Sequence, residues 1–215
     1  MSDPVDKESP PKDAVTWRSR GYLPHLERHG ATYFVTFRLA DALPHRVLEE
    51  FRAERAALLA KAQAQGVLSG EEQARLDLLV SQRIQAYLDA GKGACCLRQP
   101  GVAEIMAESL RYFAGSRYVL LGWCIMPNHV HVVLEPLPPA TLSTILHTWK
   151  SFTSNRIGRL LGYKGALWEQ EYYDHLIRDE QALWRILTYV SQNPLKANLK
   201  DWPWVEILVP QDDLL

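Results

Sequence analysis

The stretch WCIMPNHVHVVLEP, residues 123–136, combines an apolar run, a Pro-Asn turn signal and two histidines separated by one valine. Residues 118–125 and 129–134 are predicted to be two strands, because the few residues between them match the length of a hairpin loop. Side chains alternate between the two faces of a strand, so His129 and His131 share one face and the valine between them takes the other. Two neutral imidazoles in this arrangement can hold one divalent metal ion. The stretch therefore predicts a metal site on a strand.

Strand and helix signals outside this hairpin predict an α+β fold. Residues 30–39 and 167–177 are rich in β-branched and aromatic residues and are predicted to be strands. Helices are predicted at about 44–65, 69–90, 100–114, 143–161 and 179–192. Ser143 and Asp179 are the expected N-caps of the last two helices. Without a helical insertion at about 60–93, the order is β-α-β-β-α-β plus a C-terminal helix, which is the ferredoxin-like plan with an antiparallel sheet.

The chain of 215 residues is long enough for one domain with a buried core. We expect a flexible lead at 1–16, a single domain at 17–205 and a tail at 206–215. No run of eighteen apolar residues occurs and the first residues are polar, so neither a membrane span nor a secretory signal is expected. Three cysteines without Cys-x-x-Cys spacing predict neither a disulfide framework nor a zinc knuckle. A reducing, cytoplasmic setting fits these features.

The net charge of −1 conceals two basic regions. Residues 17–38 carry four arginines and one glutamate, and residues 138–165 carry four basic residues and no acidic one. Aromatic side chains lie among these cations, which suits single-stranded nucleic acid, because its phosphates need cations and its unpaired bases stack on flat rings. The alternative is that amphipathic helices simply carry basic residues on their solvent side. The candidate nucleic-acid contacts are Arg18, Arg20, Trp149, Lys150 and Arg156.

The last predicted helix carries two further candidates. Its apolar stripe is expected to be buried, and Tyr189 and Asn193 lie together on the flank of that stripe, one helical turn apart. Tyr189 could act as a nucleophile if a metal or a base assists its phenol, and Asn193 could lend an amide oxygen as a third metal ligand. Alternatively, Tyr189 is an aromatic residue at the edge of the core. Because Pro194 disfavours a helical conformation at the residue before it, Asn193 could instead cap a short turn.

Three ordered blocks extend the pattern: MPNHVHVV at 126–133, WEQEYYDHLIRD at 168–179 and YVSQNPLKA at 189–197. With RGYLPH at 20–25 and YFVTFR at 33–38, they resemble the REP-associated tyrosine transposases, which are bacterial relatives of the single-tyrosine HUH transposases of insertion sequences. The resemblance covers residues 17–205. His-x-His alone is a weak pattern, whereas three blocks in this order, ending in Tyr-x-x-x-Asn-Pro, are specific.

The resemblance implies a role for each site residue. His129 and His131 would be the HUH metal pair, Tyr189 the nucleophile, and Asn193 the third ligand, at an offset where the transposases carry glutamine. The expected ion is Mg²⁺ or Mn²⁺, which would polarise the scissile phosphate. The implied activity is DNA transposition or recombination chemistry at REP elements, with cleavage and rejoining of single-stranded DNA at palindromic hairpins through a 5′-phosphotyrosine. The implied partner is hairpin DNA in the nucleoid, bound by a monomer or a homodimer.

Three other functions fit part of the pattern. A histidine-triad nucleotide hydrolase needs a third histidine where this chain has Val133. A metal nuclease that activates water would use His129 and His131 but not Tyr189. A non-catalytic module for single-stranded nucleic acid would use only the basic and aromatic surface. His175 is a lesser candidate, either as an outer residue of the metal site or as a structural hydrogen-bond partner, and the helical insertion has no predicted role.

Overall fold

The computed structural model describes residues 15–19, 24–28, 30–44, 46–50, 53, 56–57, 60, 84–85 and 87–209. Most of the predicted lead at 1–16, most of the predicted insertion at 60–93 and residues 210–215 lie outside the described residues. Two candidate nucleic-acid contacts are affected. Arg20 lies outside the described residues, and for Arg18 only the position on a strand is described.

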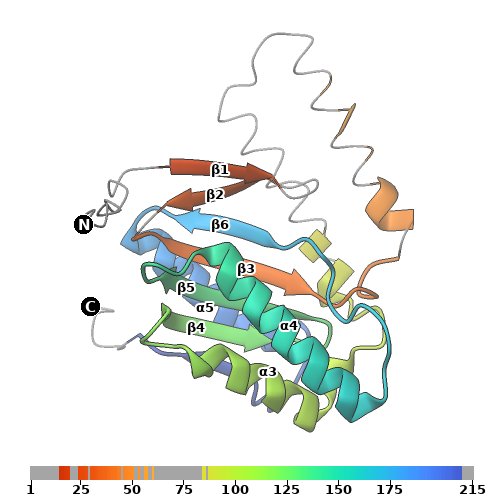
Figure 1. Cartoon of the computed structure of the whole chain (residues 1–215). Coiled ribbons are helices and arrows are strands. Elements are labelled where there is room, and N and C mark those ends of the chain that lie inside the picture. The colour runs from red at the N-terminus through yellow and green to blue at the C-terminus, as the bar shows by residue number, and fades with distance from the viewer. Residues whose placement is uncertain are drawn as a thin grey trace, which may run out of the picture.

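A five-stranded antiparallel sheet forms the centre of the protein (Figure 1). Its strand order is β6-β3-β5-β4-β7, so the histidine strand β5 is paired on both sides. The strands are β3 (Thr32–Arg38), β4 (Tyr118–Ile125), β5 (His129–Pro136), β6 (Tyr173–Ile177) and β7 (Val205–Ile207). The predicted α+β fold with an antiparallel sheet is confirmed.

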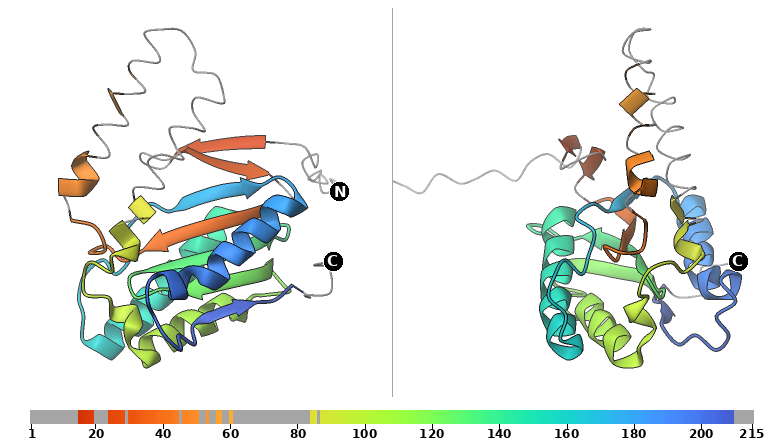
Figure 2. Two further views of the ribbon diagram at one scale, coloured as in Figure 1. Left: turned by 180° about the vertical axis from the view of Figure 1, so that it is seen from behind. Right: turned by 90° about the vertical axis from the view of Figure 1, so that its right-hand side faces the viewer.

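Helices cover both faces of this sheet (Figure 2). On one face, α3 (Pro100–Tyr112), which follows the short 3₁₀ helix η1 (Cys96–Arg98), packs beside α4 (Leu142–Leu161). On the other face, α5 (Glu180–Lys196) packs against β4 and β7. The central strands are therefore covered on both sides, which explains why nearly every residue of β5 is buried.

The ends of the helices follow local hydrogen bonding. Thr141 caps α4, because its hydroxyl accepts from the Thr144 N–H while the Thr144 hydroxyl accepts from the Thr141 N–H. The predicted cap Ser143 is therefore wrong, since this reciprocal pair starts the helix earlier. Asp179 caps α5 as predicted, and its carboxylate accepts from the Ala182 N–H at 2.7 Å.

Helix α5 does not end at Gln192, as the sequence predicts. It continues through Pro194 to Lys196. Proline removes one backbone donor and disfavours a helical residue before it, but Asn193 and Pro194 are both buried here, and this packing offsets the local preference. The interpretation of Asn193 as the cap of a separate turn is therefore wrong. Asn193 lies within α5, one turn after Tyr189.

Three strand features were not predicted correctly. β1 (Val15–Ser19) and β2 (Pro24–Arg28) pair with each other as a separate two-stranded sheet. β6 begins at Tyr173 rather than at residue 167, because Trp168 forms only an isolated bridge with Leu39. β7 is absent from the sequence prediction because three residues are too short to show an alternating pattern.

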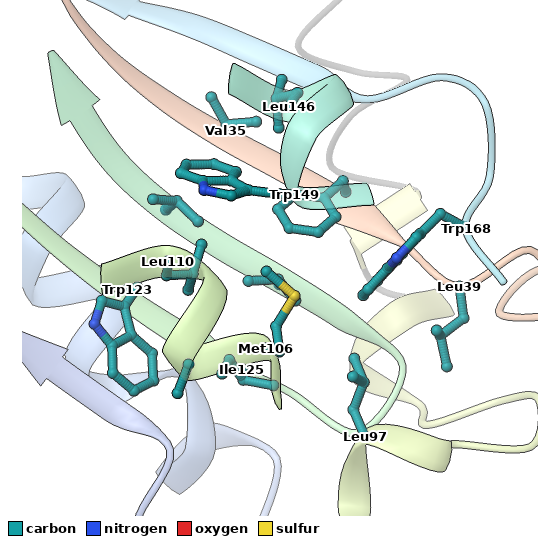
Figure 3. Packing of buried hydrophobic residues seen from close by; sticks show 14 of the residues in the cluster. Val35, Leu39, Leu97, Met106, Leu110, Trp123, Ile125, Leu146, Trp149 and Trp168 are labelled. Atoms are coloured by element: carbon teal, nitrogen blue, oxygen red, sulfur yellow. The ribbon is translucent and has the colours of Figure 1, made fainter. Parts of the chain in front are cut away.

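The alternation of β3 separates the main core from the face that carries the histidines. One set of side chains packs into the main apolar cluster, namely Tyr33, Val35, Phe37 and Leu39. Trp149 of α4 lies in this cluster near Val35 and Leu146 (Figure 3). The side chains between them, Phe34 and Thr36, contact the histidine strand and α5 instead. The sheet thus has an apolar face under α3 and α4 and a face with polar groups under α5.

Gly122 allows close packing of α5 and β7 on β4, at a point where the β4–β5 register shifts. A Cβ at this position would lie 2.9 Å from Leu187 Cδ2 and 3.0 Å from Ile207 Cδ1. We predict that Gly122→Ala lowers the free energy of unfolding by about 1–3 kcal/mol, as measured by urea denaturation. Gly101→Ala is the matched control, because its nearest atom, Leu160 Cδ2, is 3.9 Å away. Equal stability of the two variants would contradict this packing.

Candidate active site

Two buried histidines of β5 direct their Nε2 atoms toward one point. The Nε2 atoms of His129 and His131 are 3.0 Å apart, and the ring planes meet at 79°. Burial lowers the pKa of His129 well below its ordinary value, and the neighbouring His131 lowers it further. Burial also lowers the pKa of His131, to about 3. Both rings are therefore neutral near neutral pH, which is the form in which histidine binds a metal.

Hydrogen bonds hold the outer nitrogens of both rings. His129 Nδ1 lies 2.7 Å from Asn128 Oδ1, and Asn128 Nδ2 donates to the Lys92 carbonyl at 2.9 Å. Because the second bond fixes which end of the amide faces the ring, the Nδ1–H of His129 donates and its Nε2 carries the free lone pair. His131 Nδ1 lies 2.8 Å from Thr36 Oγ1. A hydroxyl can donate or accept, so Thr36 keeps this bond in either tautomer of His131.

Tyr189 of α5 lies beside this pair. Its ring centroid is 5.4 Å from that of His131 and 5.9 Å from that of Phe34, both in edge-to-face geometry. Burial raises the pKa of the Tyr189 phenol, the charge of Asp89 raises it further, and a hydrogen bond with the Asn193 side chain opposes both. The phenol is therefore protonated in this arrangement, and it needs a nearby cation or base before it can attack a substrate.

Asn193 provides a test of whether the site fits a metal ion. Its side chain is 2% exposed, and among the described residues its Oδ1 accepts no hydrogen bond. A buried oxygen without a partner is costly, so this atom lacks the group that it would normally contact. An amide oxygen is a hard ligand that suits Mg²⁺ or Mn²⁺, and imidazole also binds Mn²⁺. The residues present therefore fit such an ion.

The described residues contain no cluster of three or more His, Cys, Asp and Glu side chains that could hold a metal elsewhere. Neutral oxygen atoms of amide side chains could complete the histidine pair instead. Asn193 is one such ligand by residue type. Its side chain is hydrogen-bonded to Tyr189, and the ring of Tyr189 contacts His131.

Two further polar residues reach this site from the helical residues that precede Gly91. Gln85 Nε2 lies 3.4 Å from the Nε2 atoms of both His129 and His131. The same amide nitrogen donates to Asp89 Oδ1 at 2.7 Å. Sequence analysis missed this pair, because an amphipathic helix pattern marks apolar positions and says nothing about which polar residue meets a distant strand.

The structure places Trp149 in the core and engages the Lys150 ammonium with the backbone, so neither prediction of a nucleic-acid contact gains support. Trp149 is 1% exposed and its Nε1–H donates to the Tyr118 oxygen at 3.0 Å, whereas base stacking needs an exposed ring face. The Lys150 ammonium donates to the backbone carbonyls of Glu169 and Gln170 at 2.9 and 3.0 Å. In this position it holds the loop before β6.

The other lesser candidates lie apart from the histidine pair or outside what the structure describes. Arg156 is exposed on α4, which covers the sheet face opposite to α5 (Figure 2). Its guanidinium lies 5.7 Å from the centre of the Phe152 ring. The roles of Arg18 and Arg20 stay predictions. His175 is exposed on β6, where it pairs with Phe34 of β3, and its two possible roles stay predictions.

Comparisons with known proteins identify related sequences. Residues 97–193, from η1 to Asn193, match the family described as "Transposase IS200 like". A Haemophilus influenzae protein whose name assigns it to the REP-associated tyrosine transposases is 30% identical over an aligned length of 100 residues. The match covers 38% of this chain and 54% of that protein. The predicted resemblance to this family is confirmed. The chain spans about half the length of the curated relatives it matches, 54% and 51%.

Two solved structures are similar at a lower level. One is titled "Structure of the REP associates tyrosine transposase bound to a REP hairpin", with a TM-score of 0.46 and 16% identity over 87% of this chain and 80% of that one. The other is a Deinococcus radiodurans protein described as a transposase, with a TM-score of 0.35 and 16% identity over 82% and 96%. Neither overlap is close enough to transfer the role of a residue. In the described part of this chain, no helix has the length and apolar composition that crossing a membrane requires.

The partly buried ammonium of Lys150 predicts a pH dependence of stability. Burial lowers the pKa of Lys150 from its ordinary value of 10.5 to about 8. Between these two values the unfolded chain binds more protons than the folded chain, so stability rises with pH across that window. We predict that the free energy of unfolding of the wild type rises relative to that of Lys150→Met between pH 8 and 10, with a constant difference below pH 8. Urea denaturation of both proteins at several pH values measures this difference. A difference that does not change between pH 8 and 10 would contradict the lowered pKa of Lys150.

Proposed function

We propose that this protein is a metal-dependent transesterase for single-stranded DNA, which cleaves and rejoins strands at hairpin repeats through a 5′-phosphotyrosine. The observation that supports it most is the convergence of the His129 and His131 Nε2 atoms next to the ring of Tyr189. The match to the IS200-like transposases is a second line of support, because it comes from the sequence and not from the geometry. It covers residues 97–193, the region that contains both histidines and Tyr189.

The metal would be held by the two histidines and Asn193, through two ring nitrogens and one amide oxygen. Mg²⁺ or Mn²⁺ at this position would supply positive charge beside the scissile phosphate. Asn128 and Thr36 would keep both rings oriented for this task through their bonds to the outer nitrogens. The strand that carries the histidines is buried under helices on both faces, so the rings have little freedom to turn away.

Tyr189 would be the nucleophile. Its phenol oxygen attacks the phosphorus, forming one bond to phosphorus while the bond from phosphorus to O3′ breaks. The phenol gives up its proton and O3′ gains one, so the products are a 5′-phosphotyrosine and a free 3′-hydroxyl. Attack by a 3′-hydroxyl on the phosphotyrosine reverses the exchange and joins two strands. Because one phosphate ester replaces another, the bond energy is conserved and no nucleotide cofactor is needed.

The proposed substrate is single-stranded DNA with a REP-like hairpin. Its support is the name of the Haemophilus relative, which associates that protein with REP elements. Arg18, Arg20 and Arg156 remain candidate phosphate contacts, whereas Lys150 and Trp149 are engaged within the fold.

A metal nuclease that uses water is the second candidate. The observation in its favour is that burial and Asp89 both raise the pKa of the Tyr189 phenol, which weakens it as a nucleophile. Such an enzyme would retain the histidine pair and cut DNA without forming a bond to protein.

The substitution Tyr189→Phe tests the proposal. Hairpin-tipped single-stranded DNA is incubated with protein and Mn²⁺, and covalent protein–DNA adducts are separated on a denaturing gel. We predict adducts with the wild type and a loss of more than about a thousandfold with Tyr189→Phe, since the attacking oxygen is gone. Tyr112→Phe is the matched control, because Tyr112 is 78% exposed on α3 and should keep full adduct formation.

Each other outcome assigns a different function. DNA cleavage without adducts, unchanged in Tyr189→Phe, would replace the transesterase by the water-using nuclease. Tight DNA binding without cleavage by any variant would leave a non-catalytic binding module. Adducts that persist in Tyr189→Phe would show that another residue is the nucleophile.

The bond from Thr36 to His131 gives a second test of the metal site. Thr36→Val keeps the shape of the side chain but removes the oxygen that faces His131 Nδ1. We predict that Mn²⁺ affinity falls by about 10–100-fold, because the ring loses its orientation and its buried nitrogen loses its partner. Thr36→Ser should retain the affinity to within a few-fold. Titration of free Mn²⁺ by electron paramagnetic resonance measures both, and equal affinity for Val and Ser would contradict the role of the hydroxyl.

A further inference from the structure

The helical residues before Gly91 bring a side chain from the predicted insertion into the histidine site. Ile84, Gln85 and Tyr87–Asp89 are helical, and they lie between β3 and α3 in the sequence. Gln85 and Asp89 are one helical turn apart, so they share a face of this segment. That face meets the site, because the Gln85 amide lies 3.4 Å from both histidine Nε2 atoms.

The Gln85 amide nitrogen lies midway between the two histidines in distance. It is equally far from the Nε2 atoms of His129 and His131, at 3.4 Å from each. An ion bound equally to both Nε2 atoms, at about 2.1 Å, would also lie on the plane that is equidistant from them. The Gln85 nitrogen and such an ion would therefore each be equally far from the two Nε2 atoms.

The contacts to the histidines are too long to be the main hydrogen bonds of this amide. Good N–H bonds span about 2.7–3.2 Å, and the short bond of Gln85 Nε2, at 2.7 Å, goes to Asp89 Oδ1. The amide thus points a donor at the two Nε2 atoms without a close bond to either. Half a turn about the last side-chain torsion of Gln85 exchanges nitrogen and oxygen and presents Oε1 to the same position. This rotation breaks the bond to Asp89 Oδ1, and the exposed Asp89 carboxylate has to turn away from Oε1.

We propose that Gln85 is a ligand of the metal ion that the histidine pair holds, and that it binds through Oε1. This inference rests on the proposed function, because it needs His129 and His131 to bind a metal. With Asn193, the protein would supply two ring nitrogens and two amide oxygens. An ion of the Mg²⁺ and Mn²⁺ class takes about six ligands, so about two positions would stay open for oxygens of the DNA phosphate.

The proposal gives the segment before Gly91 a role in the reaction. A fourth ligand on this segment would fix its position relative to β5 whenever the ion is bound. Asp89, one turn later, influences Tyr189 electrostatically, and the Lys196 ammonium lies 5.2 Å from the centre of the Tyr189 ring. Metal binding at Gln85 would therefore also order the charged groups around the nucleophile.

The test is the Mn²⁺ affinity of the full chain, measured by electron paramagnetic resonance without DNA. We expect Gln85→Ala to lose at least about tenfold in affinity. Gln85→Asn, which keeps the amide but shortens the arm, should lose about as much. Gln85→Glu should bind more tightly than the wild type, because a carboxylate is a stronger ligand for this ion; unchanged or weaker binding by this variant would count against the proposal. Gln181→Ala is the matched control, since Gln181 is exposed at the start of α5 and contacts Arg185.

The outcomes separate this inference from the proposed function. A wild type that does not bind Mn²⁺ would remove the metal site itself. Binding by the wild type with unchanged affinity in Gln85→Ala and Gln85→Asn would remove only Gln85 as a ligand. Tighter binding in those two variants would also overturn the proposal, because it would mean that the amide competes with the ion. Thermal unfolding in EDTA shows which variants are folded. If Gln85→Ala and Gln85→Asn do not fold, the affinity of Gln85→Glu still decides the proposal.

Discussion

The pairing of β3 with β5, in the register that places Thr36 opposite His131, constrains the whole site. A slip of one residue would turn both histidines toward the apolar core under α3 and α4. The observed register instead directs them toward α5, where Tyr189 contacts His131 edge to face. It also gives His131 its hydrogen bond to Thr36. Because β5 is buried on both faces, the rings are neutral and rigid, which prepares two nitrogens to bind a cation.

Much of this arrangement follows from patterns that act over a few residues. The period of a strand places His129 and His131 on one face, and the period of a helix places Tyr189 beside Asn193. The Asp179 cap depends only on a side-chain oxygen and an N–H three residues later. These features could be predicted because neighbouring residues in the sequence determine them. The same reasoning predicted the antiparallel sheet with helices.

The features that could not be predicted depend on contacts between distant segments. Thr36 and Gln85 meet the histidines from far away in the sequence, and no local pattern marks either of them. α5 runs past Pro194 because burial offsets a local preference. Trp149 and Lys150 lie in a basic, aromatic stretch, yet the fold uses the ring in its core and the ammonium to hold a loop. Composition alone cannot distinguish such residues from a nucleic-acid surface.

The central claim is that the two Nε2 atoms share one ion beside Tyr189. The most direct measurement is a crystal structure of the protein grown with Mn²⁺, with anomalous scattering recorded near the manganese absorption edge. The account predicts one strong anomalous peak within about 2.3 Å of both Nε2 atoms, next to the phenol of Tyr189. A map with no peak there, in which His129 and His131 still face each other with Nε2 atoms 3.0 Å apart, would contradict it.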